Sequence, residues 1–231
     1  MALQTFSAKD YEQAGYDPTI AQIIVEQVTV IQVDESTHLK GLENAITSLG
    51  GTPATKACGF DLAPAMKDVG TFLATARTLE AVGVGGYLGA ASLLSDPAVL
   101  TTAGSILTIE ARHSALLDTF SGGAPAPQPF DLAFTPPQVL AMAGPFLSGC
   151  QASDLGLTTN QPLSAIDTKS KSTSFAVGSQ LALNTTEAAG DMAGMSCQMF
   201  SGGAVSAMVQ PADNCMIPKA MDGVSGFCPG R

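Results

Sequence analysis

Glu35-Ser-Thr-His38 and Glu110-Ala-Arg-His113 are the two stretches of sequence that decide the fold. They contain the only two histidines of the chain, and each histidine follows a glutamate by three residues. On a helix, side chains three residues apart lie on the same face. If both stretches are helical, each presents one carboxylate and one imidazole to a common neighbour.

Three long helices are predicted around these stretches, over residues 17–49, 68–94 and 95–120. In the first and third, Asp17 and Asp96 each stand before a proline, which is typical of an N-cap followed by the first helical residue. Gly-Gly pairs follow the same two helices and predict their ends. Apolar residues recur in steps of three and four, so each helix has a face that should pack against other helices.

The predicted packed faces carry glutamates where an apolar residue is expected, namely Glu35, Glu80 and Glu110. His38 and His113 lie on the same faces. Unpaired carboxylates and imidazoles in a bundle interior are costly, and facing carboxylates repel unless a cation lies between them. A single Glu/His pair would be interpreted as a salt bridge or a buried histidine. Two pairs together with Glu80 favour a metal site built from these five residues.

The second predicted helix is rich in glycine, at positions 83, 85, 86 and 89. Glycine weakens a helix by about 1 kcal/mol relative to alanine, so we expect another backbone to approach closely here. Tyr87 lies two turns beyond Glu80 on the same face. We interpret it as a packing residue rather than a redox-active phenol.

Composition excludes several classes of protein. The 231 residues carry 10 basic and 20 acidic side chains, and the resulting net charge of -10 disfavours binding to nucleic acid. Hydrophobic residues make up 45% of the chain, which is enough for a core. No uninterrupted apolar run reaches the length of about 18 residues that a membrane span requires.

After the third helix the character of the sequence changes. Residues 124–137 are rich in proline and predict a loop, and a short helix over 137–148 should close the first domain. Beyond residue 150, serine, threonine and glycine alternate with short apolar runs, which indicates a small β-rich module. We therefore expect a helical domain over 1–150 and a β-rich module over 151–231.

The five cysteines fit disulfides better than zinc, because no C-x-x-C pair is present. Cys58 and Cys150 flank the connecting loops of the helical domain and are expected to pair. Cys197, Cys215 and Cys228 lie in the β-rich module, where one must remain unpaired or join another chain.

The cysteines and the sequon Asn184-Thr185-Thr186 favour a secreted protein with an N-glycan at Asn184. Residues 1–10 lack the basic start and apolar run of a signal peptide. Secretion and the lack of signal-peptide features agree if the signal peptide has been removed by processing or is not included in this chain.

Several segments together resemble the fungal ferritin-like family of stress-response and desiccation-related proteins. The segments are residues 6–16, 35–38, 79–90, 109–113 and 127–130. The resemblance implies a mainly α fold, a ferritin-like four-helix bundle, followed by the β-rich module. Two Glu-x-x-His motifs with further glutamates are typical of ferritin-like di-iron and di-manganese proteins. The resemblance thus implies iron or manganese, as one ion or as a pair.

One departure from the family concerns the first bundle helix. Family members begin with a helix that contributes its own glutamate and precedes the segment matching residues 6–16. Only five residues precede that segment here, so we expect that the chain either is a fragment or processed form or lacks this helix. Glu12 is not expected to replace the missing ligand. The uncovered apolar face is then expected to self-associate, as a dimer or larger assembly.

Three functions remain open at this point. The first is a ferritin-like metal protein with an oxidative or stress-protective role; if catalytic, it would be a di-iron or manganese oxidoreductase. The second is a non-catalytic secreted structural or stress protein that uses the bundle as a scaffold. The third is a β-rich module that binds a partner or a glycan. No catalytic residue is assigned.

Overall fold

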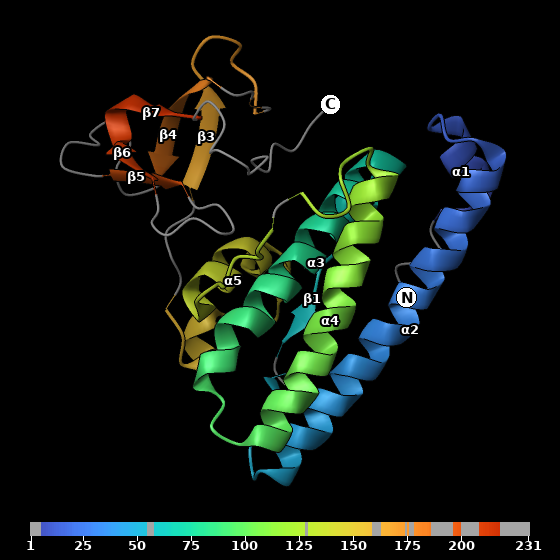
Figure 1. Ribbon diagram of the computed structural model, residues 1–231, viewed down its shortest axis with the longest axis vertical. Coiled ribbons are helices and arrows are strands. Elements are labelled where there is room, and N and C mark those ends of the chain that lie inside the picture. Colours follow the sequence, from blue (N-terminus) through green and yellow to red (C-terminus); the bar gives the residue numbers. More distant parts are fainter. Residues whose placement is uncertain are drawn as a thin grey trace.

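The structure of the protein, a computed structural model, describes residues 6–54, 58–127, 129–158, 163–173, 175, 178–185, 196–199 and 208–217. It is mainly helical, with small antiparallel sheets in the C-terminal region, as predicted (Figure 1). None of the described helices is long and apolar enough to cross a membrane.

Three long helices form the body of the structure and agree with the sequence prediction. The α-helices are α1 (Ala8–Gln13), α2 (Pro18–Ser48), α3 (Val69–Ala90), α4 (Pro97–Phe120) and α5 (Pro136–Ala143). The side chains of Asp17, Asp68 and Asp96 accept hydrogen bonds from backbone N–H groups in the first turns of α2, α3 and α4. Short 3₁₀ helices are η3 (Ala63–Met66), η4 (Ala91–Leu93), η5 (Gly144–Phe146), η6 (Ala152–Leu155) and η7 (Ala212–Asn214).

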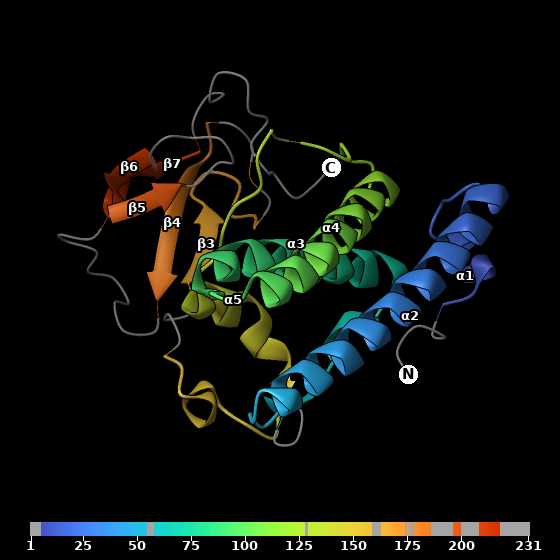
Figure 2. The same ribbon diagram turned by 60° about the horizontal axis from the view of Figure 1, so that its bottom comes forward.

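The main apolar core joins α1 and the first half of α2 to the start of α3 and the end of α4. Tyr11, Ile24 and Leu117 are almost completely buried in it. Tyr16 reinforces the junction, because its hydroxyl donates a 2.8 Å hydrogen bond to the carbonyl of Phe120. The core therefore fixes the first half of α2 against the α3–α4 pair. Figure 2 shows the other end of α2 lying apart from that pair.

The second half of α2 differs from the sequence expectation. Leu42 and Leu49 continue the face of Ile24, Val28 and Ile31, and all were expected to pack against other helices. Leu42 and Leu49 are instead 36% and 73% exposed. The buried cluster includes α2 only as far as Ile31, so the helix extends beyond its own core.

The glycines of α3 allow a close backbone approach, as predicted. The segment leading into α5 crosses α3, and the Phe134 N–H donates a 2.8 Å hydrogen bond to the Gly85 carbonyl. A Cβ atom at Gly89 would lie only 2.8 Å from the Phe134 carbonyl carbon and 3.0 Å from its nitrogen. A side chain at position 89 is therefore incompatible with this crossing.

The strands lie mainly in the C-terminal region, and all pairs are antiparallel. The first pair joins β1 (Gly59–Phe60) to β2 (Leu147–Ser148). The second sheet has the order β3 (Leu163–Asp167), β4 (Gln180–Thr185) and β7 (Cys215–Met216). The last pair is β5 (Ser196–Met199) with β6 (Met208–Pro211).

Two disulfides hold these sheets in place. Cys58 pairs with Cys150 next to the β1–β2 pair, as predicted, and closes a loop of 92 residues. Cys197 pairs with Cys215, a pairing that the sequence left open, and both are buried in the small core of the β-rich region. Cys228 lies outside the described residues.

The crossing at Gly89 leads to a prediction about stability. Replacing Gly89 with alanine should lower the free energy of unfolding by about 1–3 kcal/mol, because a new methyl group would collide with the Phe134 backbone. Urea unfolding measures the change.

Gly104→Ala is the matched control, because a Cβ atom there meets no described atom within 4 Å and the residue lies within α4. This variant should be more stable than wild type by about 0.5–1 kcal/mol. Equal effects of the two substitutions would contradict the assigned crossing.

Candidate metal centre

Helices α2, α3 and α4 bring together all five residues that the sequence singled out. Glu35 and His38 come from α2, Glu80 from α3, and Glu110 and His113 from α4. Their donor atoms form two overlapping groups of three, each with all atoms within 4.8 Å of one another. The site lies where the apolar cluster of α2 ends, so these polar groups continue the same packed face.

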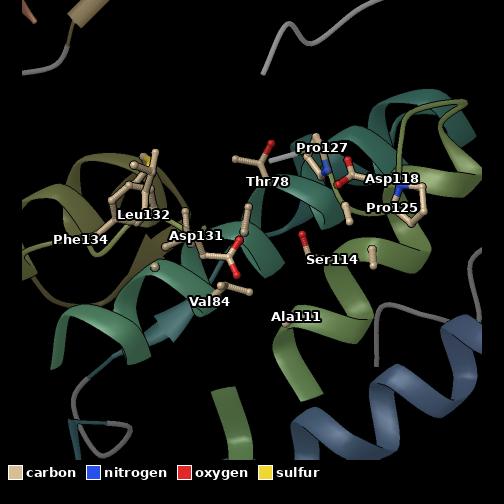
Figure 3. A pocket seen from close by; sticks show the side chains of 16 residues that line it. Thr78, Val84, Ala111, Ser114, Asp118, Pro125, Pro127, Asp131, Leu132 and Phe134 are labelled. Carbon is tan, nitrogen blue, oxygen red and sulfur yellow. The ribbon is translucent and has the colours of Figure 1, made fainter. Parts of the chain in front are cut away.

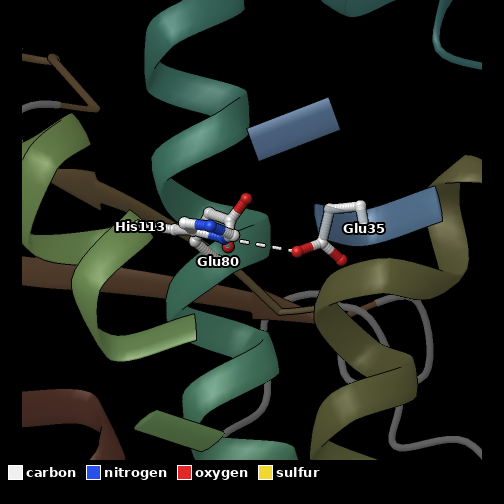
Figure 4. A group of neighbouring side chains, drawn as sticks. All are labelled: Glu35, Glu80 and His113. Carbon is white, nitrogen blue, oxygen red and sulfur yellow. Dashed lines mark hydrogen bonds and ion pairs between the residues drawn. The ribbon is translucent and has the colours of Figure 1, made fainter. Parts of the chain in front are cut away.

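The first group consists of Glu35, Glu80 and His113 (Figure 4). The Nδ1 atom of His113 lies 3.3 Å from Oε2 of Glu80 and 3.3 Å from Oε1 of Glu35. Glu80 and His113 are buried, whereas the Glu35 side chain is 43% exposed. Two of the three residues in this group are thus shielded from solvent, and the third is partly exposed to it.

The second group consists of Glu35, His38 and Glu110. The Nδ1 atom of His38 lies 3.3 Å from Oε1 of Glu35 and 3.3 Å from Oε1 of Glu110. Glu35 Oε1 therefore stands between the two imidazoles, whose ring centroids are 6.4 Å apart. Glu35 is thus common to both groups and would help to hold an ion bound in either of them.

Two atoms at the centre of the site are buried without a hydrogen bond. Oε1 of Glu35 and Nδ1 of His38 have no hydrogen-bond partner among the described residues, although they lie close together. Such atoms are costly in a protein interior. Two donors at right angles on an ion about 2.2 Å away lie about 3.1 Å apart, close to the spacing found here. The donor set therefore fits a metal ion.

The electrostatics of the site also favour a cation. Burial raises the pKa of Glu110, and the neighbouring carboxylates of Glu35 and Glu80 raise it further, so Glu110 tends to retain a proton. Burial alone would lower the pKa of His113, but the surrounding carboxylates of Glu35, Glu80 and Asp34 raise it. Protons thus offset a concentration of negative charge that a metal ion would otherwise balance.

Asp34 belongs to the site but was missed in the sequence. The Nε2–H group of His113 donates a 3.1 Å hydrogen bond to Oδ2 of Asp34, which leaves Nδ1 facing Glu35 and Glu80. Asp34 precedes His38 by four residues, a spacing that also places two side chains on one helix face. This spacing is the signal that could have identified it.

Gly83 and Tyr87 of α3 complete the surroundings. A Cβ atom at Gly83 would lie 3.0 Å from Cδ of Glu110 and closer still to its Oε2, so a side chain here would push this carboxylate out of its present position. Burial raises the pKa of Tyr87 to about 12, with smaller contributions from the charges of Glu110 and Glu35. The phenol therefore lies near the site and keeps its proton. Glu12, which was not assigned as a ligand, is exposed on α1.

Comparison with known proteins identifies the family. The model of the ferritin-like domain matches residues 1–123, which include α2, α3, α4 and all five predicted ligands. No curated protein matches the chain. Because the match covers more than half of the sequence, the chain belongs to the ferritin-like domain family.

Proposed function

We propose that the protein binds iron or manganese through Glu35, His38, Glu80, Glu110 and His113. The observation that carries the proposal is the convergence of five donors from three helices around buried atoms that lack hydrogen bonds. A bundle that served only as a scaffold would be at least as stable with apolar residues at these positions. The alternative of a non-catalytic structural protein is therefore not favoured.

The donor set supports iron or manganese as a pair of ions. Three carboxylates and two imidazoles are ligands that both metals accept, and Glu35 belongs to both three-donor groups. When bound, such ions supply one-electron redox chemistry and open coordination positions. Buried donors on α3 and α4 would hold such ions, and Glu35 is the partly exposed member of the donor set.

The biological role follows from the resemblance noted in the sequence. We infer an oxidative or stress-protective function, like that of the fungal stress-response and desiccation-related proteins, for a helical domain over 1–150 with a β-rich module over 151–231. Secretion is compatible with the two disulfides. Asn184 is exposed on β4, which suits an N-glycan. Self-association remains a prediction, and exposed apolar residues of α2 such as Val30 and Val33 offer a surface for it.

Metal content tests the proposal directly. Wild-type protein, purified without added metal and then reconstituted anaerobically with Fe²⁺ or Mn²⁺, should retain close to one or two equivalents by elemental analysis. Glu110→Gln and His113→Ala should each reduce the content below about 0.3 equivalents, because each removes a buried donor.

Glu26→Gln is the control, since Glu26 lies exposed on α2 and outside both donor groups. It should bind as much metal as wild type. Circular dichroism establishes that every variant is folded. A folded wild-type protein that takes up neither metal would contradict the proposal.

Gly83 provides a test that changes no ligand. Gly83→Ala should weaken metal binding by about tenfold or more, because the new methyl group displaces the Glu110 carboxylate. Gly86→Ala is matched to it, since a Cβ atom there meets only the Val139 side chain, at an ordinary contact distance of 3.4 Å. Competition with a chelator of known affinity measures the metal affinity of both variants. Equal affinities in the two variants would mean that Glu110 does not bind metal from this position.

Asp34 is expected to act as a positioning residue for His113. Asp34→Ala should lower metal affinity by about tenfold to a hundredfold, because the imidazole loses the acceptor that orients it. Asp34→Asn keeps a neutral acceptor and should restore part of the affinity. Ser36→Ala, exposed on the same helix, is the control. If Asp34→Asn and Asp34→Ala lower the metal affinity equally, orientation of His113 by this hydrogen bond is not the cause of the loss.

A further inference from the structure

A cavity of about 480 Å³ lies between α3, α4 and the segment that leads from α4 to α5 (Figure 3). Ala81, Ala111 and Ser114 line it, and each follows a proposed metal ligand by one residue. Adjacent residues on a helix point about 100° apart. The cavity is therefore formed by another face of the same two helices.

Small side chains on the helices leave this space open. Ala81 and Gly85 of α3 and Ala111 and Ala115 of α4 line it, together with residues 125–127 of the following segment. The lining is mostly apolar, and the volume lies within the range of about 300–1,000 Å³ that is typical of small-molecule sites. The space suits an elongated apolar molecule.

The polar groups of the cavity are distributed unevenly. Figure 3 shows Leu132 and Phe134 at one end and Asp118 beside Pro125 at the other, with Asp131 between them. Ser114 and Thr78 add hydroxyl groups. No lysine, arginine or histidine occurs among the described residues that line the cavity. Its ionisable groups are therefore carboxyl groups alone.

Asp118 is unusual because it is only 6% exposed. Its Oδ1 atom lies 3.6 Å from Nη1 of Arg77, which does not line the cavity. Burial raises the pKa of Asp118, and the Arg77 charge opposes that shift. A positively charged group in the cavity would stabilise the ionised carboxylate further, whereas an anion would be repelled.

We propose that this cavity binds a small amphiphile with a cationic amine head, the head near Asp118 and the apolar body passing Asp131 toward Leu132 and Phe134. The lining disfavours fatty acids and other anions of the same length, because no described cationic residue is present to receive them. This site is distinct from the metal centre, and neither proposal depends on the other.

Matched ligands of opposite charge test the proposal. Decylamine and decanoate, each below its micellar concentration, are titrated into the full-length protein by isothermal calorimetry at neutral pH. Decylamine should bind about tenfold or more tightly than decanoate, because the ionisable residues of the lining are aspartates, and Arg77, which pairs with Asp118, lies outside the lining. Equal affinities, or tighter binding of decanoate, would overturn the charge assignment.

Variants locate the binding to this cavity. Ala115→Leu and Ala111→Leu place larger side chains in the lining of the cavity and should each weaken decylamine binding about tenfold. Ala74→Leu, exposed on α3, is the control for an added leucine on a helix. Asp131→Asn should reduce the difference in affinity between decylamine and decanoate. Binding that survives both cavity-filling variants would overturn the proposal and would point instead to the exposed apolar residues of α2.

Discussion

The placement of Glu35 Oε1 between two buried imidazole nitrogens is the constraint on which the rest of the structure depends. Its separation from each nitrogen is 3.3 Å, and the neighbouring carboxylates of Glu80 and Glu110 concentrate negative charge in the same small volume. Protons retained by His113 and Glu110 offset this charge, but burying so many polar and charged groups still costs free energy. The fold must therefore supply the stability of the bundle elsewhere.

Contacts on two sides of the site supply this stability. On one side, the cluster around Ile24 and Leu117 joins α2 to the α3–α4 pair. On the other, the Phe134 segment crosses α3 at Gly85 and Gly89, and the Cys58–Cys150 disulfide ties down the chain beyond α5. The site itself can then contain unfavourable charge, because its geometry is imposed by packing around it.

The sequence predicted the parts of this arrangement that depend on local rules. Capping residues such as Asp17 and Asp96 defined the helices, and the three-residue spacing in each Glu-x-x-His motif placed the ligands on one face. Contacts between distant segments were harder to predict. Asp34 meets His113 across 79 residues, and the choice of Cys215 as the partner of Cys197 depends on how β4, β5 and β7 meet. The four-residue spacing of Asp34 and His38 is the only local signal for the first contact, and the second has none.

The glycines of α3 explain how the α3–α4 pair can form the metal centre on one face and contact the Phe134 segment on the other. Gly83 leaves room for the Glu110 carboxylate on the side of the metal centre, and Gly85 and Gly89 admit the Phe134 backbone on the other. Each glycine lowers the intrinsic stability of the helix by about 1 kcal/mol relative to alanine. A helix with this composition would be weak in isolation, so its order depends on being packed on both faces. The placement of the ligands and the formation of the cavity thus depend on the same local sequence. A larger or smaller side chain on one face of α3 also changes the packing that holds the other face in place.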